Sequence, residues 1–336
     1  MTSYLGKWSS ILLAGCALLT VQANAADLEK LKVQYGSLAV PAFAAPFVAK
    51  ETGAYEKAGL DVEILAGRLS QDTVNAVLAG TTDIGFVLGV NQILTVDKGQ
   101  KVVAVGNYYG RNAFGLIASK ESGVTKLAEL EGKTVILPAA SYEALLRALI
   151  ADQGGDPEKV TYVTIPQPAA MLTAYSGKQG DAVVTVIPFA RSGVESARPS
   201  TYIPFADVGD PEPLYVFIVR PDVLEQKKDA IRKFLTATYA TIGEINQNSD
   251  SMIDPFVKSV PGAKAERVVP DYQAWKEFQC APGQSVIGAP SKEALETALA
   301  LYSRVKLISN PLTAGDLMTS EFFEGSNPVS TAPCPQ

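Results

Sequence analysis

The side chains able to do chemistry in this chain suit ligand binding better than bond cleavage. The 336 residues include no histidine, which excludes His-metal sites and the Ser-His-Asp and Cys-His arrangements of nucleophilic catalysis. Ser70 and Ser141 each stand where a helix is expected to begin, as predicted N-caps. Their hydroxyls and the following backbone N–H groups could face an oxyanion, and ordinary helix capping is the competing interpretation.

The first 25 residues are predicted to be an export signal peptide. Lys7 gives a positive start, Ile11–Leu19 is a short apolar run, and Ala23-Asn24-Ala25 has the small residues of a cleavage site. We therefore expect cleavage after Ala25 and release into the periplasm. The alternative is a lipoprotein, because Leu13-Ala14-Gly15-Cys16 resembles the box at which Cys16 would be lipidated.

Export would determine the oxidation state of the cysteines. Cleavage after Ala25 leaves only Cys280 and Cys334, and an oxidising compartment favours a disulfide between them. The bridge would hold the C-terminal tail, Pro328–Gln336, against the body of the protein. Two free thiols are the alternative.

Bulk composition excludes further classes. The net charge of −6 argues against the large basic surface that nucleic-acid binding needs. No stretch after the leader reaches the roughly 18 apolar residues of a membrane span. The hydrophobic fraction of 47% supports a sizeable core. We expect a monomer with no cofactor and no metal.

The elements that must position the binding residues alternate between strand and helix. From Leu31 to Asn107 short β-rich runs alternate with amphipathic stretches, and the pattern restarts at Phe114. Such alternation predicts an α/β fold with mainly parallel sheets and helices on both faces. Gly80–Phe86 and Gly177–Val183 are similar turns, each with a glycine expected in the left-handed conformation, which suggests two similar lobes. The helices predicted after Pro221 are expected to pack on the first lobe: Val223–Asn246, Met252–Ser259, Ala274–Phe278 and Lys292–Val305.

Three segments resemble one known group of proteins. They are Ala45–Glu63 (APFVAKETGAYEKAGLDVE), Val77–Gly85 (VLAGTTDIG) and Leu127–Val135, which includes Leu-Glu-Gly-Lys-Thr-Val. They resemble the substrate-binding proteins of ATP-binding-cassette (ABC) importers for nitrate, sulfonate, taurine and thiamine precursors, which have the type II periplasmic-binding fold. The resemblance extends from Leu31 to Val219.

The resemblance implies two lobes joined by two crossovers, at Asn107–Ala113 and Asp210–Val216, that close on a ligand by hinge motion. The implied domains are the signal peptide (1–25), lobe one with the C-terminal helices (26–109 with 215–336) and lobe two (110–214). A membrane permease and its ATPase would be the partners.

Ligands of open α/β sheets bind beyond the carboxyl ends of the strands. This rule and the crossovers select the candidate ligand-binding residues Ser37, Arg68, Ser70, Gln71, Asn91, Tyr108, Tyr109, Arg111, Asn112, Ser141, Tyr142, Pro188 and Phe189. The guanidinium of Arg111, beside the first crossover, suits a carboxylate or sulfonate, as do those of Arg68 and Arg191, and a solvated or interlobe salt bridge is the alternative. Tyr108 and Tyr109 either line the cleft or pack in the core. Trp275 is expected outside the cleft.

We therefore predict a solute-binding protein that captures a small organic anion, such as an alkyl sulfonate, for an ABC importer. The second ligand hypothesis is a pyrimidine or other aromatic molecule stacked on Tyr108, Tyr109 or Phe189. A sensory domain for a membrane receptor is a further possibility. A biosynthetic enzyme is disfavoured, because the pyrimidine synthases that share the fold use histidine and a cysteine-rich run, which this chain lacks.

Overall fold

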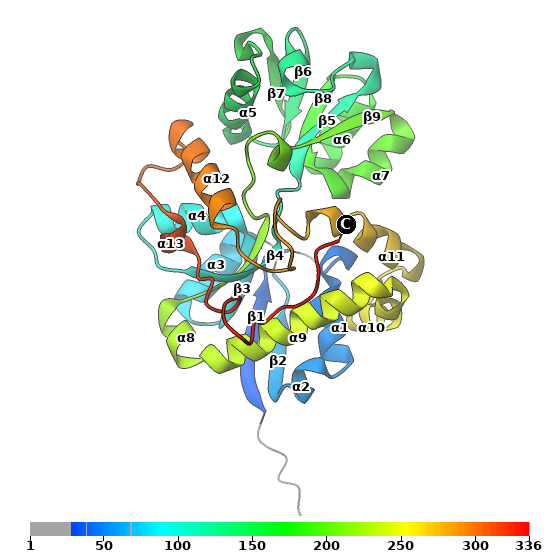
Figure 1. Ribbon diagram of the computed structural model, residues 1–336. Coiled ribbons are helices and arrows are strands. Elements are labelled where there is room, and N and C mark those ends of the chain that lie inside the picture. Colours follow the sequence, from blue (N-terminus) through cyan, green and yellow to red (C-terminus); the bar gives the residue numbers. More distant parts are fainter. Residues whose placement is uncertain (1–27, 38, 68, 336) are drawn as a thin grey trace, which may run out of the picture.

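The structure is a computed structural model that describes residues 28–37, 39–67 and 69–335. The predictions for the signal peptide, Cys16 and Arg68 lie outside the described residues. The described chain forms two α/β lobes, one above the other in Figure 1, each built on a five-stranded sheet. None of the helices in these three ranges is both long and apolar enough to cross a membrane.

The sheet of the first lobe has the order β2-β1-β3-β10-β4. Its strands are β1 (Glu29–Tyr35), β2 (Leu60–Leu65), β3 (Ile84–Leu88), β4 (Val103–Tyr109) and β10 (Tyr215–Val219). β1 pairs in parallel with β2 and β3, whereas β10 runs antiparallel to β3 and β4. The sheet is therefore mixed: β1, β2, β3 and β4 run in the same direction, and β10 runs against them because it enters the sheet only after the chain has returned from the second lobe.

The second lobe repeats this arrangement in the order β7-β6-β8-β5-β9. Its strands are β5 (Phe114–Ser119), β6 (Thr134–Leu137), β7 (Thr161–Thr164), β8 (Ala182–Val186) and β9 (Ser200–Pro204). Again four strands run in the same direction, and β5, which enters from the other lobe, is antiparallel to its neighbours β8 and β9. Its main helices are α5 (Ser141–Asp152), α6 (Pro168–Ser176) and α7 (Ile187–Ala197). The two similar lobes expected from the sequence are confirmed.

The repeated helix-to-strand turns differ in one detail. Gly80 adopts the predicted left-handed conformation, with φ 74°. Gly177 does not, since its φ of −78° keeps it in line with α6. Lys178 takes the positive φ of 63° instead, one residue later than predicted.

Helices cover both faces of the first sheet. They are α1 (Ala44–Glu51), α2 (Ala54–Lys57), α3 (Ser70–Ala79), α4 (Gly89–Asp97), α8 (Pro221–Gln226), α9 (Lys228–Gln247), α10 (Ile253–Ser259) and α11 (Ala265–Gln273). The long α9 buries Ile231, Phe234, Leu235 and Ile242 in the same core as the strand residues. The expected packing of C-terminal helices on the first lobe is thus observed for α9 to α11.

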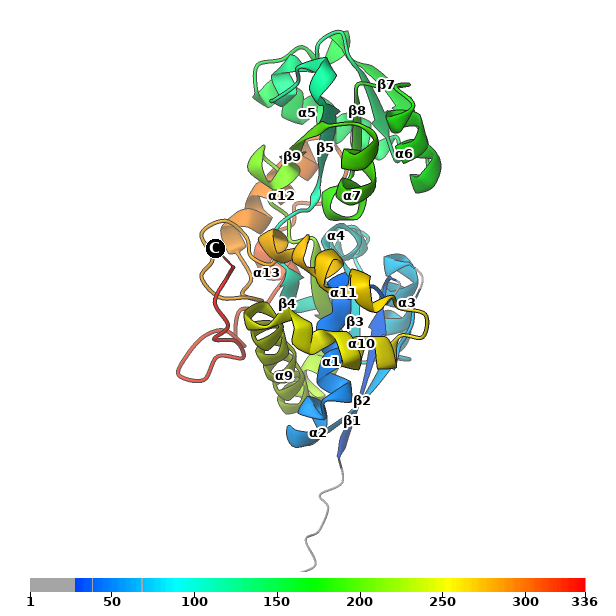
Figure 2. The same cartoon turned by 90° about the vertical axis from the view of Figure 1, so that its right-hand side faces the viewer.

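Helix α12 (Lys292–Arg304) contacts both lobes. It is followed by α13 (Ala314–Leu317), which packs against α4 and β4 of the first lobe. Arg304, the last residue of α12, donates two hydrogen bonds to the carboxylate of Asp152 in α5, at 2.8 and 2.5 Å. Figures 1 and 2 both place α12 beside the gap between the lobes. It is therefore a third link between them, besides the two crossovers.

Candidate functional site

A cavity of about 310 Å³ lies at the junction of the two lobes. The first lobe contributes the end of β3 and the start of α4, the second contributes the start of α5, and both crossovers and α12 complete the wall. The lining residues are Leu88, Val90, Asn91, Leu94, Asn112, Phe114, Ser141, Tyr142, Leu145, Phe205, Asp210, Glu212, Tyr302 and Leu307. This volume is at the lower end of the range of small-molecule sites.

Two carboxylates, Asp210 and Glu212, stand in the wall where the second crossover passes the cavity. Their side chains are 1% and 4% exposed. Each precedes a proline in the run Asp-Pro-Glu-Pro, and a residue before proline favours extended backbone. In an extended segment the side chains two residues apart point the same way, which brings both carboxylates to one side.

The hydrogen bonds of this carboxylate pair satisfy only part of it. Asn112 from the first crossover donates to Asp210 Oδ2 at 3.1 Å, and the Tyr302 hydroxyl of α12 lies 3.4 Å from the same oxygen. Asp210 Oδ1 and Glu212 Oε2 have no hydrogen-bond partner among the described residues. A buried carboxylate oxygen without a hydrogen-bond donor lowers the stability of the fold. The described residues therefore satisfy the hydrogen-bonding needs of the pair only in part.

Burial dominates the electrostatics of the pair. Loss of solvation raises the pKa of Asp210 to about 7, although the donors Tyr302, Glu212 N–H and Asn112 act in the opposite direction. Burial also raises the pKa of Glu212 well above its usual value, and the nearby charge of Asp210 raises it further, while the Tyr302 hydroxyl acts in the opposite direction. The pair therefore retains a proton near neutral pH.

The rest of the wall is mainly apolar, with aromatic and aliphatic side chains, and it has no positive side chain among the described residues. Phe114 and Tyr142 lie with ring centroids 5.1 Å apart, and Phe205 and Tyr302 add two further rings. Within the described part of the chain, no lysine or arginine lines this cavity. A ligand here would meet carboxylate oxygens and ring faces.

Four of the predicted binding residues line the cavity: Asn91, Asn112, Ser141 and Tyr142. The predicted capping roles of Ser70 and Ser141 are wrong, because Leu69 and Ala140 hold the N-cap positions and neither helix start has a side-chain cap. The Ser70 hydroxyl instead accepts a hydrogen bond from Leu88 N–H at 3.0 Å, which ties α3 to the end of β3.

Other predicted residues lie away from the cavity. Tyr108 and Tyr109 are at most 1% exposed in the core of the first lobe, which is the alternative considered for them. The Tyr109 hydroxyl donates to the Ala42 carbonyl at 2.5 Å, and Tyr108 accepts from Ala45 N–H at 3.3 Å. Ser37 hydrogen-bonds to the side chain of Tyr215.

The exposed Gln71 lies near the start of α4 without lining the cavity. Its side-chain oxygen accepts a hydrogen bond from Asn91 at 3.4 Å, and its nitrogen donates to Asn75 at 3.2 Å. Gln71 is therefore one contact removed from the cavity wall.

The described arginines near the hinge are engaged with acidic groups. Arg111 donates to the Asp207 carboxylate at 2.5 Å and to the Glu277 carbonyl at 3.3 Å. Arg191 of α7 donates to the Glu277 carboxylate at 3.1 Å. Neither lines this cavity, but both line a second hollow of about 650 Å³, and the buried Nε of each has no hydrogen-bond partner among the described residues. Both form the interlobe contacts that the sequence left open as the alternative to ligand binding.

Pro188 and Phe189 line a separate hollow of about 160 Å³ between α7 and the first lobe. The Phe189 ring meets Trp275 edge-on, with centroids 4.6 Å apart. Trp275 therefore lies at an interlobe contact, contrary to its expected place outside the cleft. It reports on the relative position of the lobes, because Phe189 belongs to the second lobe and is 49% exposed.

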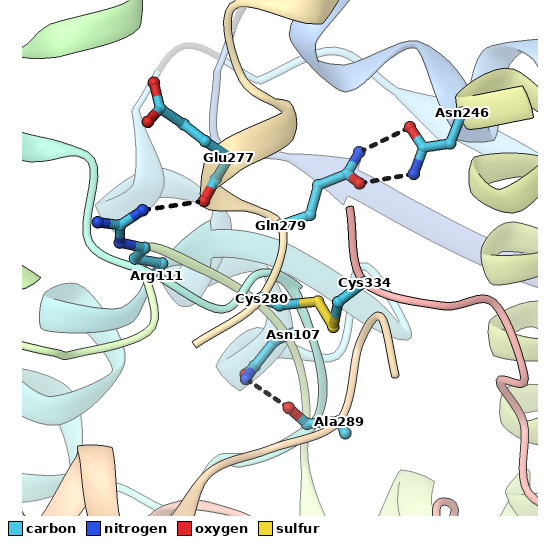
Figure 3. Close-up of a disulfide and its surroundings, with 8 residues drawn as sticks. All are labelled: Asn107, Arg111, Asn246, Glu277, Gln279, Cys280, Ala289 and Cys334. Atoms are coloured by element: carbon cyan, nitrogen blue, oxygen red, sulfur yellow. Dashed lines mark hydrogen bonds between the residues drawn. A yellow bond between two sulfur atoms is a disulfide. The ribbon is translucent and has the colours of Figure 1, made fainter. Parts of the chain in front are cut away.

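The predicted disulfide between Cys280 and Cys334 is confirmed (Figure 3). It holds the C-terminal tail beside the loop that follows Phe278, where Cys334 N–H also bonds to Ser285 O at 3.0 Å. That loop contacts the first crossover, since Gly110 N–H donates to Gln279 O and Arg111 N–H to Phe278 O, both at 3.1 Å. The bridge thus braces one of the two hinge segments.

The sequence reasoning missed Asp210, Glu212, Phe205 and Tyr302 as site residues. A signal for the first two was present: two acidic residues alternate with prolines inside a predicted crossover, which must pass the cleft. Tyr302 carried no such signal, because it belongs to a distant helix whose position depends on packing against α5.

Comparisons with known proteins agree with this architecture. The NMT1/THI5-like family model matches residues 40–250. A Brucella abortus protein named as a binding protein is 24% identical over 226 residues, covering 65% of this chain and 68% of its own. The periplasmic aliphatic sulphonate binding protein SsuA from Escherichia coli has the same fold, with a TM-score of 0.68 and 17% identity over 89% of this chain and 95% of its own.

A relative with an enzyme's name also matches. The 4-amino-5-hydroxymethyl-2-methylpyrimidine phosphate synthase of Schizosaccharomyces pombe is 21% identical over 240 residues, or 69% of this chain and 64% of its own. A protein named for binding and a protein named for biosynthesis therefore both match this chain in sequence. Because the family model covers well over half of the residues, the chain belongs to the NMT1/THI5-like family.

Proposed function

We propose that this chain is the periplasmic substrate-binding protein of an ABC importer and captures a small organic solute in the interlobe cavity. The observation that carries the proposal is the composition of the cavity wall, to which both lobes, both crossovers and α12 contribute. A solute there would contact every part that moves when the lobes close. The permease would then recognise the closed form, and no bond of the solute would change.

Several features favour binding over catalysis. The chain has no histidine, and the cavity wall contains no cysteine or lysine among the described residues. The predicted signal peptide and the disulfide both suit an exported protein. The fold shared with the Escherichia coli sulphonate-binding protein supports the same role.

The family resemblance indicates the class of solute less directly than it indicates the binding function. Our first expectation, an alkyl sulfonate, relies on arginines that here bond to Asp207 and Glu277. The cavity instead offers carboxylates and aromatic rings, which favours the second expectation, a pyrimidine or other aromatic molecule, although the rings named for stacking, Tyr108, Tyr109 and Phe189, do not line it.

Lobe closure provides the test of the general function. After removal of the leader, Trp275 is the only tryptophan, and its edge-on contact with Phe189 changes when the lobes move. We expect a bound solute to change Trp275 emission, to lower the radius of gyration in X-ray scattering, and to stabilise the fold by roughly 2.7 kcal/mol at 100 times its Kd. Alkyl sulfonates, carboxylates, pyrimidines and aromatic amines would be screened in parallel.

The Phe189→Ala variant is the matched control, because it should lose the emission change while retaining the change in scattering. If no compound in the four classes stabilises the protein or alters its scattering, the proposed function is wrong.

A further inference from the structure

We infer that the buried Asp210–Glu212 pair is the recognition site for an organic cation, a small aromatic or apolar molecule that carries an N–H-bearing ammonium or amidinium group. The inference rests on the proposed function, since it names the class of solute that the interlobe cavity would take. The family resemblance led us to expect an anionic solute, whereas this inference gives the solute a positive charge.

The first argument is the unpartnered oxygens. Asp210 Oδ1 and Glu212 Oε2 are buried without a donor, although both residues line the cavity. An ammonium has up to three N–H donors and an amidinium presents a planar pair of them, so either could bond to both carboxylates at once. An anion could accept only the proton that the pair holds, and any ionised carboxylate of the pair would repel it.

The second argument compares the negative charge of the two carboxylates with the positive partial charge of the helix N-termini. The starts of α4 and α5 face the cavity through Asn91 and Ser141, and each helix N-terminus is worth roughly half a positive charge. Two ionised carboxylates outweigh this partial charge by about one unit. The pair is therefore the dominant electrostatic feature once a cation promotes its ionisation.

The third argument is the aromatic wall. Phe114, Tyr142, Phe205 and Tyr302 surround the same space as the carboxylates. Ring faces attract cations as well as apolar groups, and this attraction is larger where water is excluded. A cation on an apolar body would use both the rings and the carboxylates.

Cation binding should also release the proton that the carboxylate pair holds. The other titratable groups facing the pair are Tyr142 of α5 and Tyr302 of α12, whose pKa values burial raises, so they stay neutral in this range. The affinity for an ammonium should therefore rise with pH between 6 and 8, by up to tenfold per unit for each proton released.

The experiment uses probes that share one ring and differ in charge: benzylamine, benzamidine, benzyl alcohol and phenylmethanesulfonate. Calorimetry and thermal shift at pH 8 should detect the two cations and show at least tenfold weaker binding of the alcohol and the sulfonate. The Asp210→Asn/Glu212→Gln double variant should lose at least tenfold in affinity for the cations. Asp222→Asn, which alters an exposed carboxylate of α8 outside the cavity, should retain it within about twofold.

Three results would overturn the inference: no binding of either cation, equal binding of the sulfonate, or cation binding that the double variant leaves unchanged. Unfolding cannot mimic the expected loss, because the double variant should be more stable than the parent at pH 8. If a sulfonate or a neutral pyrimidine closes the lobes instead, the inference fails while the proposed function stands. If no compound closes them, both fail.

Discussion

Asp210→Asn is expected to raise the stability of the ligand-free protein at pH 8 by on the order of 4 kcal/mol, and by less than half of that at pH 5. In the folded chain burial raises the pKa of Asp210 from 3.8 to about 7. Each pKa unit corresponds to about 1.36 kcal/mol between the two protonation states. Asparagine keeps the oxygen that accepts from Asn112 and removes the charge that must be buried above pH 7.

The sign follows from proton binding. Between pH 4 and 7 the folded state holds a proton on Asp210 that the unfolded state has lost, so the free energy of unfolding falls as pH rises through this range. Because the chain has no histidine, no other side chain with an ordinary pKa titrates between pH 5.5 and 8. The decline in that interval can therefore be assigned to the carboxylate pair.

Urea unfolding at pH 5, 6, 7 and 8 measures this effect. The parent should lose stability with rising pH, Asp210→Asn should reduce the slope, and adding Glu212→Gln should remove most of the remainder. Asp222→Asn is the matched control, since Asp222 is an exposed carboxylate whose pKa Arg220 lowers, and it should leave the slope above pH 5.5 unchanged. A parent protein with constant stability from pH 5.5 to 8 would contradict the assignment.

The fold was largely predictable because its signals are local. Strand–helix alternation and the glycine after α3 depend on neighbouring residues, and they identified the order of the strands in both lobes and most of the helices. Helix α7 (Ile187–Ala197) was not predicted, because Pro188 at its start was read as part of a loop. Helix α11 was missed because Pro270 lies in its interior, where proline removes one backbone hydrogen bond and normally ends a helix. Here the buried side chains of Val268 and Tyr272 anchor the helix on the first lobe and offset that cost.

The site was predictable only in part. The rule on carboxyl ends of strands identified Asn91, Ser141 and Tyr142, because it depends on topology alone. Which arginines are free to meet a ligand depends on the distant acids that reach them, as Asp207 reaches Arg111 across 96 residues. Which carboxylates lack donors depends likewise on the whole cavity wall. A local sequence pattern does not show such long-range pairings.

The hinge segments receive support from elements far along the chain. Residues 278–279 bond to the first crossover, α12 places Tyr302 against the second, and the disulfide holds the tail against the first of these supports. The binding cavity therefore depends on the C-terminal region as well as on the two lobes.

Removal of the disulfide, by Cys280→Ser/Cys334→Ser, is expected to lower the free energy of unfolding by about 2–4 kcal/mol. The bridge closes a loop across a sequence separation of 54, and the chain-entropy relation gives about 4 kcal/mol for that length as an upper value. Urea unfolding of the oxidised parent and the double variant measures the difference. The reduced parent is the matched control, because it loses the bridge without a change of sequence and should unfold with the double variant.

The loss should also be local to the hinge. The tail contacts Ile287 and Ser285 through backbone hydrogen bonds, and the adjoining residues 278–279 bond to Gly110 and Arg111. Without the covalent tie, these bonds open more often, so hydrogen exchange should accelerate at 110–111 and 285–287 while the amides of β5 to β9 keep their rates. A double variant that unfolds within 0.5 kcal/mol of the parent, with unchanged exchange at these amides, would show that the packed tail braces the first crossover without the disulfide.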